Sequence, residues 1–285
     1  MKKLVTKILS ACLACALVIC FGGCKETING SYVSRVNLDI SYTVSGETST
    51  INSTLTLYET FAPKTTERIK ELVKAGFYDN TVITLSEQQD YAIVGGYTYG
   101  EDYVVKAYDK TLEGEFTNAG LKSENVVKAG ALVMLRDFDV KVGAEKYNTA
   151  RASFAIVLSD SGIFDEEDFC VFGYIDSESL ESLKTAFIDN AVDEDGDLRM
   201  RYLGERDKES GSLNYQNGFD YYINASSGKT VYYKLVNGEK VEMEYATDND
   251  EDYHKVNDVI KDDDFSQDLI VFPEVVFSVK ASIKK

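Results

Sequence analysis

Residues 62–96 read APKTTERIKELVKAGFYDNTVITLSEQQDYAIVGG, and this stretch decides the fold. Pro63 stands where a helix would begin, a position at which the missing N–H of proline needs no partner. The apolar residues that follow have helical spacing and predict one buried face: Ile69, Leu72 and Val73. Gly76 is placed to end the helix.

The same stretch indicates how the helix starts and what comes after it. Thr65 or Thr66 can supply a side-chain cap for the first turn. After a Gly-Phe-Tyr-Asp turn, residues 82–85 are mostly apolar and predict a short strand that leads towards Gly95–Gly96. The stretch therefore predicts a helix, a turn and a strand in sequence.

Alternating apolar residues dominate the flanking sequence. Residues 34–58 alternate on both sides of a Ser45–Gly46 turn and predict a β-hairpin. Further apolar strands are predicted at 131–135, 152–158 and 169–175, and the Gly- and Tyr-rich segment 97–110 is predicted to be a loop. A second helix is predicted from Ser177 to Ile188, with Ser177 as its cap.

The opening stretch resembles the cyclophilins, a family of peptidyl-prolyl isomerases, and four later motifs match that family in the same order. These motifs are LEGEF at 112–116, GALVMLR at 130–136, NTARASFAI at 148–156 and CVFG at 170–173. The resemblance spans roughly residues 37–189 plus a final strand. It implies a mostly β fold, a closed antiparallel barrel of up to eight strands with two helices.

The chain departs from the family pattern after the second helix. We expect residues 34–189 to form the barrel, 190–267 an acidic insertion, and 268–285 the closing strand. Within 229–245, Asn237–Gly238 separates two alternating arms, which is a strong hairpin signal. The hairpin tyrosines could form a partner-binding face or belong to an ordinary sheet: Tyr232, Tyr233 and Tyr245.

Prolyl isomerisation must overcome an amide barrier of about 18–20 kcal/mol. A positively charged donor near the prolyl nitrogen favours the twisted state, and such a donor acts best when it is pre-placed in a dry site. The resemblance implies an arginine on the strand before Gly-Gly. In this chain that position holds Leu85, and because the following segment is one residue longer, Thr84 or Ser86 could take its place.

The resemblance also places the peptide groove, and most of its usual residues are replaced. The expected groove positions are Leu85, Tyr91, Ala92, Val94, Ser153, Ala155, Phe164 and Phe169. Arg136 and Arg151 lie in matched motifs, so either could act as a relocated donor or be a structural or surface arginine.

Residues 1–23 predict a signal peptide, with lysines followed by a short apolar run. Phe21-Gly22-Gly23-Cys24 resembles a bacterial lipobox, which implies a lipid on Cys24 and a tether over 24–33. The alternative is an ordinary secretory signal cut nearby. Either reading predicts an extracytoplasmic location, and the first predicts anchoring to the bacterial cell membrane.

Composition narrows the classes of ligand. The formal net charge of −18 opposes binding to phosphate backbones, so we expect no nucleic-acid partner. His254 is the only histidine, and the aspartates around Gly196 do not match an EF-hand loop, so we expect no metal and no cofactor. Cys170 lies in an apolar strand and is expected in the core.

Two functions fit these patterns. The first is a peptidyl-prolyl isomerase-like lipoprotein that acts on proline-containing peptides of exported or surface proteins, with activity weakened or lost because Leu85 replaces the arginine. The second is a non-catalytic module on the same barrel that binds a peptide or a surface partner.

Overall fold

The structure is a computed structural model, and part of the chain is described. The described residues are 26–86, 88–120, 125–136, 147–160, 162, 164–202, 205–206, 213–214, 219–224, 231–242 and 269–284. The predicted signal peptide and Cys24 lie outside them. Among these residues, none of the helices has the length and apolar character that a membrane span requires.

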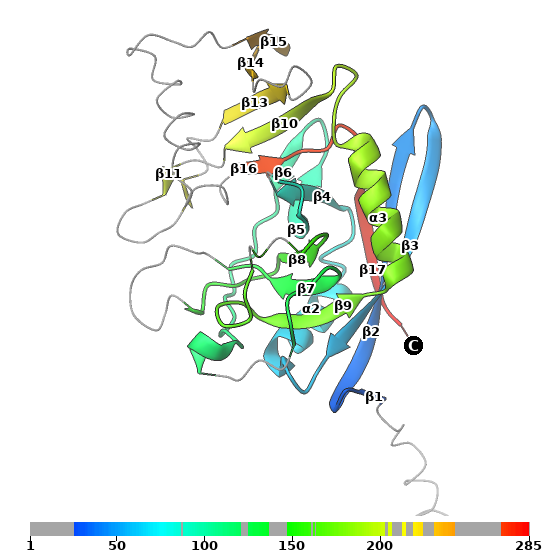
Figure 1. The fold of residues 1–285 in the computed structure, drawn as a ribbon, viewed down its shortest axis with the longest axis vertical. Helices are drawn as coiled ribbons and strands as arrows, with labels where there is room; N and C mark the ends of the chain where they lie inside the picture. The colour runs from blue at the N-terminus through cyan, green and yellow to red at the C-terminus, as the bar shows by residue number, and fades with distance from the viewer. Residues whose placement is uncertain are drawn as a thin grey trace, which may run out of the picture.

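Eight of the described strands close into an antiparallel barrel, which confirms the predicted fold (Figure 1). They are β2 (Ser31–Val44), β3 (Glu47–Tyr58), β4 (Thr81–Ser86), β5 (Tyr91–Tyr99), β7 (Ala131–Met134), β8 (Phe154–Val157), β9 (Val171–Ile175) and β17 (Ser278–Ile283). The order around the barrel is β17, β2, β3, β9, β7, β8, β5 and β4, and β4 also pairs with β17. The predicted hairpin is β2 and β3, paired from Val33–Tyr58 to Val44–Glu47.

Helix α2 (Pro63–Lys74) begins at the predicted proline, but its predicted threonine cap is wrong. Thr65 and Thr66 are buried, and no side chain of the helix start caps it. Instead, the carboxylate of Glu115 accepts the backbone N–H groups of Lys64 (2.9 Å) and Thr65 (2.7 Å). An acidic group fits there because the free N–H groups and the helix dipole favour negative charge.

Helix α3 (Ser177–Asn190) has Asp176 as its cap, not the predicted Ser177. The Asp176 carboxylate accepts the backbone N–H groups of Ser179 and of Thr54 on β3, both at 2.9 Å. One side chain therefore starts the helix and ties it to the barrel wall, and Figure 1 shows α3 lying across the side of the barrel near β3 and β17.

Two predicted irregular segments contain strands. Within the predicted tether, β1 (Thr27–Ile28) pairs with the start of β2. In the predicted loop 97–110, β5 continues to Tyr99 and β6 (Tyr103–Val105) pairs back onto it. A short 3-10 helix, η1 (Thr117–Ala119), follows.

The predicted insertion builds a sheet that continues from the barrel. Its strands are β10 (Asp197–Tyr202), β13 (Phe219–Asn224), β14 (Val231–Val236), β15 (Glu239–Glu242) and, as a separate pair, β11 (Glu205–Arg206) and β12 (Leu213–Asn214). The β14–β15 hairpin turns at Asn237–Gly238, both with positive φ, as a type I′ turn requires.

The predicted closing strand is two strands. β16 (Leu269–Val271) pairs with both β10 and β4 and so joins the insertion sheet to the barrel, whereas β17 closes the barrel. Residues 272–276 leave the edge of β4, and the Phe277 carbonyl accepts the Ile83 N–H again at 3.0 Å.

Buried apolar side chains form two clusters, because alternate residues of a strand point to opposite faces. The inner cluster fills the barrel and continues beneath α2 and α3, with Leu38, Leu55, Ile69, Phe154 and Phe187 among its members. The outer cluster lies on the opposite face of the same strands. It comprises Val82, Tyr91, Ile93, Tyr97, Tyr103, Ala131, Val133, Ala155, Val157, Phe164, Phe169, Val171, Ile270 and Phe272.

Candidate functional site

The outer cluster holds four of the predicted groove positions. Ala155 lies between Ile93 on β5 and Val133 on β7, its cross-strand partners. Tyr91, Phe164 and Phe169 form a chain of rings, with centroids 4.8 Å and 5.0 Å apart. All of these side chains are buried.

The remaining β4 and β5 groove positions point the other way. Leu85 pairs with Ala92, and both belong with Val94 to the inner cluster. Thr84 pairs with Ile93, so Thr84 faces the outer side, because directly opposed residues share a face. A register shift between Val82 and Thr84 accompanies this alternation.

Thr84 is fully buried, and its hydroxyl oxygen has no hydrogen-bond partner among the described residues. An unpaired buried hydroxyl is costly, so its presence on the outer face is a feature to explain. The outward position nearest to the family's arginine is thus a small polar residue.

The two arginines considered as relocated donors differ in position. The Arg136 side chain is largely buried, with its guanidinium carbon 5.0 Å from the centre of the Phe169 ring and its Nε donating to the carbonyl of Asp168 at 3.0 Å. Arg136 therefore borders the outer cluster. Arg151 is exposed, and Ser153, the last predicted groove residue, is half-buried.

Sequence reasoning missed two arginines of the insertion, Arg199 and Arg201 on β10. The guanidinium carbon of Arg201 lies 4.6 Å from the centre of the Phe272 ring, and that of Arg199 lies 5.8 Å from it. Both arginines pair with Asp102 and Asp220, at 2.5–3.1 Å. Their i, i+2 spacing indicated a shared face, but nothing local identified their partners.

Burial and the paired aspartates act in opposite directions on these arginines. Burial lowers the pKa of Arg199, and the hydrogen bonds and charges of Asp220 and Asp102 outweigh it and raise the pKa. The pKa of Asp102 is lowered, because the backbone N–H of Tyr103 and the two arginines outweigh its own burial. Arg199 and Asp102 therefore both carry their charges at neutral pH.

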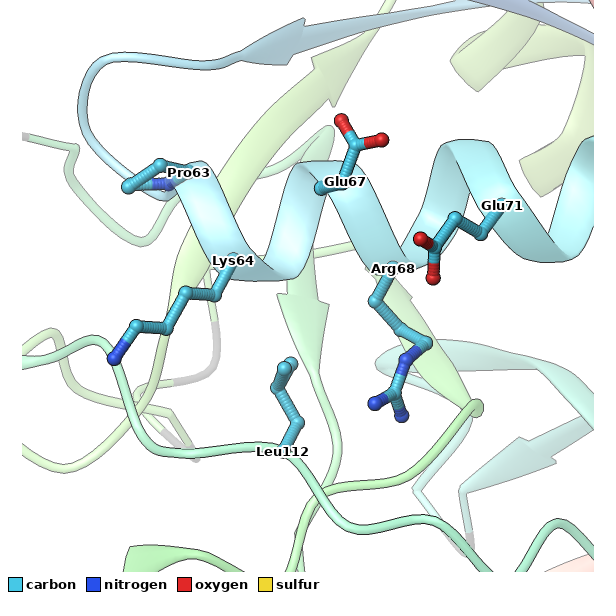
Figure 2. A pocket seen from close by; sticks show the side chains of 6 residues that line it. All are labelled: Pro63, Lys64, Glu67, Arg68, Glu71 and Leu112. Atoms are coloured by element: carbon cyan, nitrogen blue, oxygen red, sulfur yellow. The ribbon is translucent and has the colours of Figure 1, made fainter.

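Helix α2 borders an open hollow with Leu112, as Figure 2 shows. Arg68 points from the helix towards the segment of Leu112, and its guanidinium donates to the carbonyls of Lys110 (2.8 Å) and Arg151 (3.1 Å). Arg68 thus holds two loops to the helix, and three more charged side chains of α2 line the hollow: Lys64, Glu67 and Glu71.

The other chemical candidates are occupied by structural contacts. Burial raises the pKa of the Cys170 thiol to about 12, so this cysteine stays protonated. The ammonium of Lys240 pairs with Asp193 and Asp197 (2.8 Å to the latter), in the acidic loop considered for calcium. Among the described residues, no cluster of potential metal ligands is present.

The closed antiparallel barrel of eight strands with two helices is a fold of the cyclophilin type. The family of cyclophilin-type peptidyl-prolyl cis-trans isomerases matches residues 43–200, more than half of the chain. This protein therefore belongs to that family. The match ends near β10, so β16 and β17 lie beyond it.

Solved structures of low sequence identity are also similar. A crystal structure of a cyclophilin-type isomerase from Cryptosporidium parvum is 20% identical over 58% of this chain and 90% of that chain, with a TM-score of 0.39. A second structure, of that isomerase in the presence of the dipeptide Ala-Pro, is 18% identical over 56% of this chain and 89% of that chain, with a TM-score of 0.37. No curated protein was found to match.

Proposed function

We propose that this protein is a peptidyl-prolyl isomerase-like lipoprotein that acts on exported or surface proteins, with isomerase activity that is weak or lost. Membership of the isomerase family supports the class of function. The observation that carries the proposal of weakened activity is the pair Thr84 and Leu85, of which the first faces outward and the second inward.

Neither side chain can replace a cation. Leucine donates no hydrogen bond, and the uncharged hydroxyl of Thr84 is a weaker donor towards a developing lone pair than a charged one. Since removing one pre-placed donor from an active site typically costs about 100- to 1,000-fold in rate, this difference suffices for a large loss of activity.

A proline-peptide isomerisation assay on residues 25–285, which include every described residue, tests the proposal. We expect little or no rate enhancement at low micromolar protein. Strong enhancement would overturn the loss of activity, and a matched pair of variants would then locate the donor. Arg136→Lys keeps the charge but loses the planar guanidinium beside Phe169, and Arg151→Lys makes the same change at an exposed position.

A second function is favoured by a specific observation, the uncharged pair Thr84 and Leu85 at the position where the resemblance implies a catalytic arginine. In this alternative the protein is a non-catalytic module that binds a peptide or a surface partner. Binding of the proline peptide, measured separately, without rate enhancement in the isomerisation assay would favour this alternative over the isomerase.

The location is part of the proposal. A lipid on Cys24 would hold the barrel at the bacterial membrane surface, where proline-containing exported proteins emerge. Cys24→Ala is expected to release the protein from membranes into the soluble fraction. Retention of this variant in the membrane would contradict lipid anchoring.

A further inference from the structure

Residues 272–276 form a loop that lies against the outer cluster, and we call it the plug loop. It connects β16 to β17. Val271 pairs with Leu85 and Ser278 pairs with Val82, so six residues cover a stretch of β4 that two residues would span. The surplus residues leave the barrel edge.

The plug loop begins with Phe272–Pro273, an aromatic–proline dipeptide that the outer face receives closely. The Phe272 ring is fully buried, with centroids 5.2 Å from Tyr97 and 4.4 Å from Tyr103. Pro273 is buried beside it, and the Tyr103 hydroxyl donates to its carbonyl at 2.7 Å. An aromatic wall and one donor to a peptide carbonyl are the features of a peptide site.

Charged residues fasten the plug loop from outside. Arg199 and Arg201 reach across from β10 to Asp102, in the turn between β5 and β6, and Arg201 also donates to the Tyr103 carbonyl at 2.9 Å. The Phe272 backbone N–H donates to the Arg199 carbonyl at 2.9 Å. The same arginines cover the Phe272 ring, so the insertion sheet acts as a clamp.

The position of the dipeptide separates it from ordinary core. Val271 and Phe277, at the two ends of the loop, both belong to the inner cluster, whereas Phe272 belongs to the outer one. Glu274, in the middle of the loop, is exposed, and Val275 and Val276 are half-buried. The loop therefore has inward-pointing residues at both ends, while contacts from other elements hold its middle: the Tyr222 hydroxyl donates to Glu274 at 3.1 Å and the Val275 N–H donates to the Asn190 carbonyl at 3.4 Å.

We propose that Tyr97 and Tyr103 line a binding site for aromatic–proline peptides. In the structure, the Phe272–Pro273 segment of the same chain occupies this site intramolecularly. The inference rests on the proposed function, since it assigns both a ligand class and an internal competitor to the outer face. The unpartnered Thr84 hydroxyl, on the same face of neighbouring β4, is available to a ligand carbonyl when the loop leaves.

The test is fluorescence anisotropy with a labelled peptide of residues 269–276, LIVFPEVV, carrying appended lysines for solubility. The full-length chain is compared with Phe272→Ala, which empties the site, and with Arg201→Gln, which loosens the clamp. Arg35→Gln is the matched control, because it breaks an exposed pair with Glu26 at the other end of the described chain. We expect each test variant to bind at least about tenfold more tightly than wild type and the control variant.

Arg201→Gln keeps the test decisive if Phe272→Ala fails to fold. Equal binding by wild type and Arg201→Gln would overturn the inference, and so would an absence of binding by both. A second measurement uses Thr84→Val within the Arg201→Gln background, where the gained affinity should fall.

The two proposals fail in different ways. Tighter peptide binding by the clamp variant together with strong isomerisation by wild type would contradict only the loss of activity in the proposed function. Little or no isomerisation together with unchanged peptide binding across all variants would contradict only the plug loop.

Discussion

The two apolar clusters lie on opposite faces of β4, β5, β7, β8 and β9, but their residues come together in different ways. The inner cluster takes Phe154 and Ile156 from β8, and each of the seven remaining barrel strands also contributes inward-pointing apolar residues. The outer cluster takes Ala155 and Val157 from β8, and it is completed by Phe272 from beyond the insertion. Apolar alternation within each strand therefore specifies the interior of the barrel. The exposure of the outer face depends instead on a residue that is distant in sequence, Phe272.

Truncating one phenylalanine in each cluster gives the largest expected effects. Phe154→Ala removes a ring that packs against Tyr78 and Phe172, and we expect it to lower the free energy of unfolding by about 3–5 kcal/mol. Phe272→Ala is expected to act locally, so that amide exchange becomes faster in β10 and β13 but not in β2 and β3. Urea unfolding and hydrogen exchange by mass spectrometry measure these two effects.

Ile188→Ala is the control for both variants, because this side chain is 69% exposed and the change should stay within about 0.5 kcal/mol. Faster exchange in β2 and β3 of Phe272→Ala would contradict the independence of the two clusters, because they would then unfold as one unit.

The next largest effect on the free energy of unfolding is expected from Glu115, which caps the start of α2. Glu115→Gln keeps the shape of the side chain but removes the charge and one of the two acceptor oxygens at the helix start. We expect a loss of about 1–2 kcal/mol in the free energy of unfolding. Glu113→Gln, two residues away on an exposed side chain, should cause no resolvable loss. Equal effects of the two variants would contradict the capping role.

Local signals predicted the barrel well, because helix starts, glycine turns and alternating strands depend on neighbouring residues. Pro63, Gly76 and Asn237–Gly238 all stand where the structure uses them. The cap from Glu115 could not be predicted, because it lies 50 residues from Thr65 in sequence and nothing in LEGEF indicates the contact.

The candidate site was harder to predict because it depends on register. The pairing of Leu85 with Ala92 and of Thr84 with Ile93 puts Ala92 on the inner side and Ile93 on the outer side, and a one-residue slip always exchanges the two faces of a strand. The clamp of Arg199 and Arg201 depends on partners about 20 and 100 residues away, which sequence spacing cannot supply.

Acid should weaken the link between α3 and the barrel. Burial alone would raise the pKa of Asp176, but the backbone N–H groups of Thr54 and Ser179 outweigh it and lower the pKa. Because the folded-state pKa is below the unfolded one, the stabilisation is present above the unfolded value and is lost as pH falls through the folded value. Asp176→Asn should cost about 1 kcal/mol at neutral pH, a modest figure because the group is exposed and screened.

Urea unfolding of wild type and Asp176→Asn at neutral pH and near pH 3 measures this contribution. The difference between the two proteins should shrink in acid, where the wild-type carboxylate becomes protonated. A difference that stays constant with pH would assign the effect to packing and not to charge.

The smallest expected effects concern two lysine ion pairs of α2, which belong to neither cluster. Lys70 pairs with Glu59 on the barrel at 2.7 Å, and both side chains are more than four-fifths buried, whereas Lys64 pairs with Glu113 and both are at least half exposed. Water screens the second pair, so Lys64→Gln should leave the unfolding curve unchanged, while Lys70→Gln should cost about 0.5–1 kcal/mol. Thermal unfolding at low and high salt separates the two, because salt screens exposed pairs more strongly. A larger loss for Lys64→Gln would show that the surface of α2 supports the barrel as the clusters do.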